Sequence, residues 1–437
     1  MPKVLIITYY WPPSGGSGVQ RWLKFAKYLP QFGWEPVIYT PENPDFALKD
    51  ETLLKDVAAT TTVIRTKIWE PYQLFNRLTG KKTEKANVAL MSEKKGNSRL
   101  QKLAMTLRGN LLIPDPRCFW IKPSVKFLTE YLKDHPVDAI VTTGPPHSMH
   151  MIGLGLHKQT NIPWIADFRD PWTNIDFYKD LHLTWLADKI HRHKEQRVVQ
   201  QADAVIVVSD QMKREYEQLL PKRIDLIYNG FDNDDCLPNV TPTSEQFTIS
   251  HIGLISQARN PNLLWKVLSE LIAENAVFGQ LLHLKLVGKT DTSVKESITH
   301  FGLLPYVTLV DHVSHDEAIR LQSEAQVLLL LINRSPNAKG IITGKLFEYL
   351  AAEKVILAIG PSDGDVASIL NKTQAGTTID FDDEKRLKAT LLAYFERFQN
   401  HTLQPETADI RRFSRKSLSV ALVQVLNELH ATQSQHA

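Results

Sequence analysis

Two glycine-containing segments of this chain have the residue types that bind an anion at the start of a helix. Residues 14–18 (Ser-Gly-Gly-Ser-Gly) follow an apolar run and open a segment with helical periodicity. Residues 340–348 (Gly-Ile-Ile-Thr-Gly-Lys-Leu-Phe-Glu) also follow an apolar run, and they add the cation Lys345. Glycine allows a ligand to approach the backbone closely, and the first turn of a helix has unpaired N–H groups. We expect both segments to contact phosphate or a similar group, with a plain tight turn as the alternative for residues 14–18.

The spacing of the glycines excludes two familiar phosphate motifs. Residues 14–18 lack the G-x-G-x-x-G pattern of a dinucleotide site, and the second predicted strand ends without an acidic residue for a ribose. Residues 340–348 resemble a P-loop, but three residues separate the glycines instead of four, and Leu346 replaces the serine or threonine. Neither segment is therefore predicted to bind its ligand in the manner of these motifs.

Residues 340–348 still have the features of a helix N-terminus that can bind phosphate, and a carboxylate follows. Thr343 and Gly344 are predicted to present backbone N–H groups, and Lys345 supplies a positive charge. Glu348 comes one turn later, where its carboxylate can accept two hydrogen bonds from hydroxyl groups. Phosphate plus ribose is the simplest ligand that suits both features. The alternative is an amphipathic helix with a surface glutamate.

Three further polar side chains follow apolar runs that we predict to be strands. His147 comes after Thr-Thr-Gly-Pro-Pro, Asp170 ends the segment Asp-Phe-Arg-Asp, and Arg259 comes shortly after Gly-Leu-Ile. Asp170 could act as an acid or orient a polyhydroxylated substrate, and Arg259 could contact a phosphate. The alternatives are a structural histidine, a structural ion pair in Asp-Phe-Arg-Asp and a solvated arginine. Residues 14–18, His147 and Asp170 fall at the strand ends of one predicted sheet, and together they favour a site more than any one of them does.

These residues are positioned by a repeated pattern of short apolar runs, loops with Gly or Pro, and helical stretches. Continuous apolar strands that alternate with helices predict parallel sheets covered on both faces. We expect an α/β protein of two doubly wound, Rossmann-like domains, 1–228 and 229–409, that face each other across a ligand-binding cleft. A helix in 410–437 is expected to pack back on the first domain, and 233–246 reads as a linker. The predicted strands are 3–8, 35–40, 62–65, 139–143, 164–167, 204–209, 247–252, 284–287, 307–310, 327–331 and 355–359.

Composition excludes several classes of protein. The 437 residues predict two or three domains, and 43% hydrophobic residues exclude a disordered chain. Two cysteines exclude a disulfide framework, and no apolar run approaches the roughly 20 residues of a membrane span. We therefore predict a cytoplasmic protein. Because H-E-x-x-H, paired C-x-x-C, EF-hand and strand-following Asp-x-Asp patterns are all missing, we expect no metal and no cofactor. Nor is there the G-x-S-x-G elbow of a hydrolase.

The net charge of +3 is unevenly distributed. Residues 81–126 contain eleven of the 51 Lys and Arg but three of the 48 Asp and Glu, so they carry +8 and the rest carries −5. Apolar residues, Phe119 and Trp120 among them, are interleaved with these cations. This pattern predicts that an insertion at about 66–126 docks on the anionic inner face of a membrane. A solvated loop with an ordinary core helix is the alternative, and nucleic acid is not expected because no nucleic-acid motif accompanies the charge.

The sequence resembles the nucleotide-sugar-dependent glycosyltransferases of the two-Rossmann-domain (GT-B) type, in the large retaining family 4. The resemblance covers nearly the whole chain and is specific for the family, but not for the sugar. It implies a nucleotide-diphosphate sugar as donor, and a glycan or lipid-linked acceptor in cell-surface polysaccharide synthesis. The segments that carry it are Gly15-Gly16-Ser17-Gly18, Ala-Asp-Ala-Val-Ile-Val-Val-Ser at 202–209, Ile-Tyr-Asn-Gly-Phe-Asp at 227–232, Leu-Val-Gly at 286–288 and Lys-Leu-Phe-Glu-Tyr-Leu-Ala-Ala at 345–352.

In the first domain the resemblance implies roles for five residues. Gly15, Gly16 and Gly18 would approach the donor phosphate or the acceptor. His147 falls where family members place a histidine near the donor sugar. Asp170 matches the aspartate of an Arg-Asp-Trp-like segment in relatives that build bacterial surface polysaccharides.

In the second domain the resemblance implies that Arg259 and Lys345 neutralise the leaving diphosphate, and that Glu348 binds the ribose. The chain departs from the family in two places. The family often has a Glu-x7-Glu pair, and its first glutamate is Gly340 here, which puts the donor-sugar contacts in doubt. The lysine of a Lys-Gly pair is also missing, and we expect Arg259, rather than Lys266, to replace it.

The implied reaction is a front-side displacement with retention, of the hexosyltransferase type and without a metal ion. The acceptor hydroxyl attacks the anomeric carbon on the face that the nucleotide diphosphate leaves, and the leaving phosphate takes the proton. Two alternatives remain at this point. One is a sugar-nucleotide epimerase of the same fold, and the other is a non-catalytic protein that retains the fold.

Overall fold

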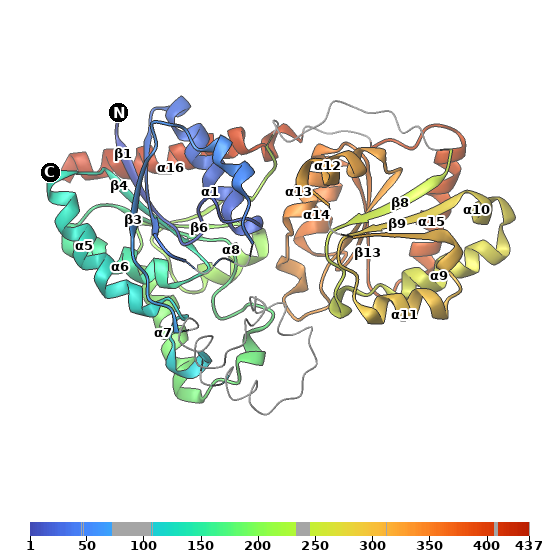
Figure 1. Cartoon of the computed structure of the whole chain (residues 1–437), viewed down its shortest axis with the longest axis horizontal. Helices are drawn as coiled ribbons and strands as arrows, with labels where there is room; N and C mark the ends of the chain where they lie inside the picture. Colours follow the sequence, from blue (N-terminus) through green and yellow to red (C-terminus); the bar gives the residue numbers. More distant parts are fainter. Residues whose placement is uncertain are drawn as a thin grey trace. The chain divides into compact units, whose positions relative to one another are not determined.

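The computed structural model describes residues 1–44, 46, 48–71, 106, 108–232, 245–311, 313–405 and 410–436 (Figure 1). It divides into two compact units. Unit 1 comprises Met1–Asn229 together with Arg415–Ala437, and unit 2 comprises Gly230–Ser414. The segment predicted to be a linker lies almost entirely outside the described residues.

Unit 1 is built on a parallel sheet with the strand order β3-β2-β1-β4-β5-β6-β7 in the described part of the chain. Its strands are β1 (Lys3–Ile7), β2 (Glu35–Pro41), β3 (Thr62–Thr66), β4 (Ala139–Gly144), β5 (Trp164–Phe168), β6 (Ala204–Val207) and β7 (Ile224–Leu226). Its helices among the described residues are α1 (Ser17–Tyr28), α5 (Ile121–Asp134), α6 (Ser148–Thr160), α7 (Trp185–Gln201), α8 (Asp210–Glu217) and α16 (Arg415–His436).

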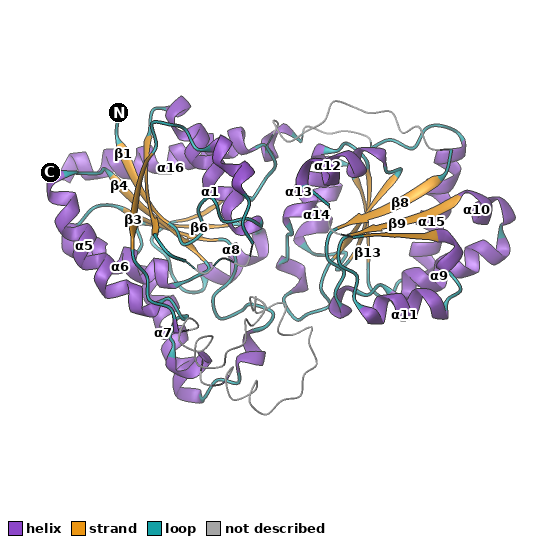
Figure 2. Ribbon diagram, in the orientation of Figure 1, coloured by secondary structure: helices purple, strands orange, loops and turns teal. Residues whose placement is uncertain are grey.

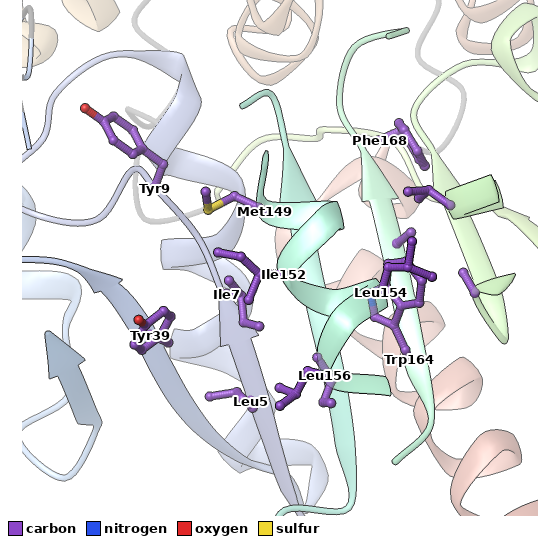
Figure 3. Close-up of a cluster of buried hydrophobic side chains, with 14 of the residues drawn as sticks. Leu5, Ile7, Tyr9, Tyr39, Met149, Ile152, Leu154, Leu156, Trp164 and Phe168 are labelled. Atoms are coloured by element: carbon purple, nitrogen blue, oxygen red, sulfur yellow. The ribbon is translucent and has the colours of Figure 1, made fainter. Parts of the chain in front are cut away.

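Helices cover both faces of this sheet. On one face, α5 and α6 pack on β1, β4 and β5, and Figure 3 shows Ile152 and Leu156 of α6 beside Leu5 and Ile7 of β1. On the other face, α1 and α16 share a second core with alternate residues of the same strands. Each large apolar side chain buried in this way contributes about 1.5–3 kcal/mol. The sheet is therefore held between two cores, which fixes the positions of its strand ends.

Unit 2 is built on a second sheet of strands (Figure 2). The strands are parallel, and their order among the described residues is β10-β9-β8-β11-β12-β13. Its strands are β8 (Phe247–Ile252), β9 (Leu282–Val287), β10 (Val307–Val310), β11 (Val327–Leu331), β12 (Val355–Ile359) and β13 (Gly376–Ile379). Its helices are α9 (Asn262–Glu274), α10 (Ala276–Leu281), α11 (Thr292–His300), α12 (His315–Glu324), α13 (Gly344–Ala351), α14 (Asp365–Thr373) and α15 (Glu384–Gln399). Helices α9, α10, α11 and α15 contribute to one core against the sheet, and α12, α13 and α14 lie on the opposite face.

Short 3-10 helices complete both units. They are η1 (Leu29–Phe32), η2 (Glu51–Asp56), η3 (Cys118–Trp120), η4 (Tyr178–Leu181), η6 (Gln257–Arg259), η7 (Leu304–Tyr306), η8 (Ala338–Gly340) and η9 (Arg411–Phe413). No helix in the described part of the chain is both long and apolar enough to cross a membrane.

Each sheet has one point where the order of the strands reverses. In unit 1 it lies between β1 and β4, and in unit 2 between β8 and β11. Open α/β sheets bind ligands beyond the carboxyl ends of their strands at such a point. The predicted fold class, two doubly wound Rossmann-like units, is confirmed. The two strands that the sequence prediction lacks, β7 and β13, are short edge strands.

Candidate functional site

In unit 2 the predicted phosphate segment forms the start of α13. Thr343 is the N-cap residue and has extended backbone angles, and Gly344 is the first helical residue. The Thr343 side chain makes no capping hydrogen bond, and its Oγ1 atom is buried without a partner among the described residues. A helix N-terminus whose cap hydroxyl is unused can accept an additional polar group.

Lys345, in the first turn of α13, points toward the end of β8. Its Nζ atom lies 3.4 Å from Nε2 of His251, and a Cβ atom at Gly253 would be only 2.3 Å from that Nζ. No carboxylate forms a salt bridge with Lys345 among the residues that the structure describes. Burial, with the nearby positive charge of Arg259, lowers the pKa of Lys345 to about 8, against the opposing effect of Glu348. The ammonium group is thus charged at neutral pH, and no anionic group among the described residues is in contact with it.

Gly253 is required in this position for two reasons. Its φ of 125° lies in the region that residues with a Cβ atom rarely adopt, and the space of a Cβ is filled by Lys345. Its carbonyl group also lies against Gly288, where an added Cβ would come within 2.9 Å. The loops after β8 and β9 therefore meet closely beneath the lysine.

The other predicted residues of unit 2 surround this lysine. Arg259 ends η6, its Nε donates a hydrogen bond to the Oδ1 atom of Asn333, and its charge acts on Lys345. Glu348 is exposed, and its Oε2 atom accepts a hydrogen bond of 3.3 Å from the buried Gln322 of α12. The structure thus brings Thr343, Gly344, Lys345, Arg259 and Glu348 to the switch point of the second sheet. Two cations, a helix start and a carboxylate acceptor can together bind an anion that also has hydroxyl groups.

In unit 1 the segment with the predicted glycines is held in place by backbone hydrogen bonds. Residues 14–18 are anchored by an antiparallel bridge between Ser14 and Lys49 and by a hydrogen bond from the Gly15 N–H to the Leu48 carbonyl. Gly16, with a φ of 86°, immediately precedes α1. Gly18 lies in the first turn of that helix.

Arg169 occupies the space beside Gly18. A Cβ atom at Gly18 would be 3.3 Å from its Nη1, and the guanidinium donates hydrogen bonds to the carbonyls of Gly18 and Pro145. Asp170, the next residue, is exposed. The structure therefore brings Gly18 and the Asp-Phe-Arg-Asp segment together at the strand ends of the first sheet, with Arg169 between the two loops.

His147 directly precedes α6, on the same edge of the sheet. Its ring stacks on Trp172, with the centroids 4.7 Å apart and the planes 1° from parallel. Asp115 accepts hydrogen bonds from the N–H and hydroxyl of Ser148, which fixes the start of α6. Burial, with the neighbouring His150, His191 and Arg169, holds the pKa of His147 well below its usual value. His147 is therefore neutral at physiological pH and is poorly suited to donate a proton.

Asp167 does not pair with Arg169, as an ion pair within the Asp-Phe-Arg-Asp segment would require. Its buried carboxylate accepts hydrogen bonds from Arg21, from the Trp22 indole and from the Thr143 hydroxyl. The Arg21 Nη2 atom lies 2.8 Å from Asp167 Oδ1. Although burial alone would raise it, the charge of Arg21 and these hydrogen bonds lower the pKa of Asp167. Asp167 therefore belongs to the framework of the fold.

Most of the predicted basic insertion lies outside the described residues, and the described part differs from the prediction in two places. Arg117 forms a salt bridge with the fully buried Glu70, with 2.9 Å between Nε and Oε1, and lies over the ring of Tyr9. Trp120 is buried and stacks on Tyr39. Counting charges along the sequence cannot separate such core residues from surface ones. Within the described residues, no group of three His, Cys, Asp or Glu could hold a metal ion.

Comparison with known proteins supports the architecture. Residues 88–235 match the family model of Glycosyltransferase Family 4. No curated protein sequence matches the chain.

Three solved structures show the breadth of the structural likeness. Sucrose-phosphate synthase from Thermosynechococcus elongatus has a TM-score of 0.64 at 14% identity, over 99% of this chain and 100% of that one. Anabaena HepE in complex with UDP-glucose has a TM-score of 0.62 at 14% identity, over 98% and 100%. An enzyme described as a UDP-N-acetylglucosamine 2-epimerase from Listeria monocytogenes has a TM-score of 0.55 at 10% identity, over 97% and 95%. At these identities the likeness is one of fold.

Proposed function

Given a GT-B fold and a likeness to the glycosyltransferases of family 4, we propose that this protein transfers a sugar from a nucleotide-diphosphate sugar to an acceptor hydroxyl, with retention. The observation that carries the proposal is the cationic site at the start of α13. It combines Lys345, which has no carboxylate in contact among the described residues, with an uncapped helix start. A nucleoside diphosphate supplies the charge and the ribose hydroxyls that this site and Glu348 can bind.

The proposed roles follow from the positions of the residues. Lys345 and Arg259 stabilise the negative charge that grows on the diphosphate as the bond to the anomeric carbon breaks. Thr343 and Gly344 present the helix start to the same phosphates, and Glu348 accepts hydrogen bonds from the ribose. The acceptor oxygen forms its bond on the face that the diphosphate leaves, and its proton passes to a phosphate oxygen. No step requires a protein base, a metal ion or a cofactor.

In unit 1 we propose that Gly16, Gly18, His147 and Asp170 contact the sugar and the acceptor. A neutral His147 can exchange a hydrogen bond with a sugar hydroxyl without adding charge. Asp170 is exposed and can orient a hydroxyl group of the acceptor.

Calorimetry with a panel of UDP-, GDP- and ADP-sugars, with and without EDTA, tests the proposal. We expect one nucleotide series to bind in EDTA, with the free nucleoside diphosphate retaining most of the affinity. Incubation with acceptor extracts should then consume the donor and yield a product that retains the anomeric configuration. Failure of every nucleotide to bind would contradict the proposal and favour a non-catalytic protein.

A sugar-nucleotide epimerase is the second candidate, because the Listeria epimerase has the same fold over nearly the whole of both chains. The two activities differ in their need for an acceptor. NMR spectra of the donor, incubated with the protein and without acceptor, separate them. An epimerase inverts a stereocentre of the sugar, whereas a transferase leaves the donor unchanged or hydrolyses it slowly.

We further propose that the acceptor is lipid-linked or a glycan at an anionic membrane surface. Large apolar side chains remain exposed near the insertion: Leu111 is 71% exposed, and Trp185 is 77% exposed. The Asn110 carboxamide accepts hydrogen bonds from the Thr184 N–H and hydroxyl, so the chain segments that carry these two side chains lie side by side. Exposed apolar groups beside basic residues suit the interface of an anionic bilayer.

Liposome co-sedimentation tests the membrane proposal. Vesicles with anionic lipid should retain the protein, vesicles of neutral lipid should not, and replacing Leu111 and Trp185 together by serine should reduce binding several-fold. A matched control replaces Leu220, which is 73% exposed and lies shortly after α8, by serine. Equal binding to both kinds of vesicle would contradict the proposal.

A further inference from the structure

His251 occupies the point where the two central strands of unit 2 separate. It lies in β8 and is 1% exposed. The pairing of β8 with β11 covers only Ile249 with Val327 and Ser250 with Leu328. Directly beyond this pairing, the Nδ1 atom of His251 lies 2.8 Å from the Leu329 carbonyl oxygen. A side-chain hydrogen bond from the imidazole thus joins β8 to β11 at the switch point, beyond the last residues that pair through their backbones.

The bond to Leu329 determines which ring nitrogen carries the proton. A carbonyl oxygen only accepts hydrogen bonds, so Nδ1 is protonated and Nε2 has a free electron pair. The Lys345 Nζ atom, a donor, lies 3.4 Å from Nε2. Burial, then the charges of Lys345 and Arg259, hold the pKa of His251 well below its usual value, although the hydrogen bond to the Leu329 carbonyl opposes them. The ring is therefore neutral and can accept a hydrogen bond from the ammonium group.

A second contact joins α13 to the adjacent residue of β8. The hydroxyl of Tyr349, one turn after Lys345, accepts a hydrogen bond of 3.0 Å from the Ile252 N–H. Two consecutive residues of β8 thus hold two residues on one side of α13. The lysine side chain lies in the space that Gly253 leaves open.

We propose that His251 is a positioning residue that holds the Lys345 ammonium group over the switch point, so that it contacts the diphosphate of the donor. The inference rests on the proposed function, because the diphosphate is the ligand of that site.

An imidazole suits this role better than a carboxylate would. A carboxylate would also orient the lysine, but it would neutralise the ammonium group and repel the incoming phosphates. A neutral acceptor fixes the side chain and leaves its full charge for the ligand. It also lowers the entropy that a flexible lysine loses on binding, because the side chain is already ordered.

Two variants separate the roles of the two ring nitrogens of His251. In His251→Asn, the amide nitrogen can still donate to the Leu329 carbonyl, but no atom reaches the position of Nε2. In His251→Gln, the longer side chain can place an amide oxygen at that position, but it loses the bond to Leu329. We expect His251→Asn to weaken the binding of inorganic pyrophosphate, measured by calorimetry, by about tenfold, and His251→Gln to remain within about threefold.

The opposite order would overturn the inference. If His251 serves only to join β8 to β11, then His251→Asn binds normally and His251→Gln is the weaker and less stable variant. Urea unfolding, followed by circular dichroism, identifies a variant that loses affinity because unit 2 has lost its structure.

A titration of the free protein provides a readout that requires no ligand. The pKa of Lys345 can be followed by NMR of lysine side chains, with Lys345→Met to assign the signal. Loss of the acceptor should lower that pKa in His251→Asn and leave it near the original value in His251→Gln. If the pKa of Lys345 is unchanged in both variants, the inference about His251 is overturned but the proposed function is not. Failure of the unchanged protein to bind either pyrophosphate or any nucleoside diphosphate would overturn the proposed function as well.

Discussion

At the strand ends of unit 1 a buried cation is held by a carboxylate, whereas in unit 2 a partly buried cation is held by a neutral imidazole. Arg21, which is 1% exposed, contacts Asp167, and Arg117 contacts the buried Glu70. In unit 2, Lys345 contacts the neutral His251. A cation that already has a buried counterion strengthens the fold but offers little charge to a ligand. A cation that lacks a buried counterion has a lowered pKa, and a bound anion then stabilises its charged form.

The largest expected effect follows from removing a counterion in unit 1. Asp167→Ala leaves the buried Arg21 without its carboxylate, and such a change typically costs about 3–5 kcal/mol of unfolding free energy. Because eight of the nine tryptophans lie in unit 1, the tryptophan fluorescence of a urea titration reports on that unit. Lys133→Ala, which removes an exposed partner of Glu130, is the matched control and should cost less than about 1 kcal/mol. Equal losses in the two variants would contradict the distinction between framework and surface charges.

Filling the space under Lys345 should disturb unit 2 next most strongly. Gly253→Ala forces a Cβ atom into a residue with a φ of 125° and against the lysine side chain. We expect a loss of about 1–3 kcal/mol in stability, because a strained backbone position costs about that much. Nucleoside diphosphate binding should be lost as well, since Lys345 must move.

Gly302→Ala is the control for the backbone effect. Gly302 also has a positive φ, of 68°, but a Cβ atom added there would meet no neighbouring atom within 4 Å. The variant should lower stability and leave nucleotide affinity unchanged. If Gly253→Ala and Gly302→Ala bind equally well, the position of Lys345 does not matter for binding.

Removing the charge of Lys345 should affect ligand binding more than stability, whereas Asp167→Ala should mainly affect stability. In Lys345→Met, a partly buried charge with no carboxylate in contact among the described residues is replaced by an apolar side chain of similar length, so unfolding free energy should not fall. The affinity for the best nucleoside diphosphate should fall about 10- to 100-fold, because a charge-assisted hydrogen bond is lost. A loss of stability comparable to that of Asp167→Ala would remove the contrast between the units.

The pH dependence of binding provides a further test. The pKa of Lys345 is lowered to about 8, so the free protein loses this charge as the pH rises through 8. Affinity for a nucleoside diphosphate should therefore be constant between about pH 7 and 7.5 and should fall by up to about tenfold per pH unit above pH 8. The terminal phosphate titrates near pH 6, below this range. Calorimetry in buffers of different ionisation enthalpy should show proton uptake on binding above pH 8, and Lys345→Met should show none.

The difference between the units also explains what the sequence could predict. Apolar runs such as 327–331 and 355–359 gave the bounds of β11 and β12, because a strand buried on both faces has few polar residues. Local spacing also placed Thr343, Gly344, Lys345 and Glu348 at a helix start. The partners of these residues come from other elements, and no local pattern marks them.

Particular residues show where sequence reasoning ends. His251 lies within an apolar strand and reads as an ordinary core position, although its Nδ1 bonds to a residue 78 positions away. Asp167 has a neighbouring arginine in sequence, yet its partner is Arg21 on α1, 146 positions away. In the most basic stretch of the chain, Trp120 is buried in the core of unit 1, and the partly buried Arg117 forms a salt bridge with the buried Glu70. In each case a long-range contact decides the role of the residue.

The smallest expected effect concerns Gln322, which holds Glu348 in unit 2 as His251 holds Lys345. The Gln322 amide is buried, and it donates to one carboxylate oxygen of Glu348 and leaves the other open for a hydroxyl group. In Gln322→Met this hydrogen bond is lost, but the carboxylate is exposed and can still rotate toward a ribose. We expect nucleotide affinity to fall only about two- to fivefold, since a single hydrogen bond contributes about 0.5–1.5 kcal/mol. Glu348→Ala should reduce the affinity further, and the double variant should equal Glu348→Ala alone. Additive losses would mean that Gln322 contacts the ligand itself, and that the ribose is then bound by both α12 and α13.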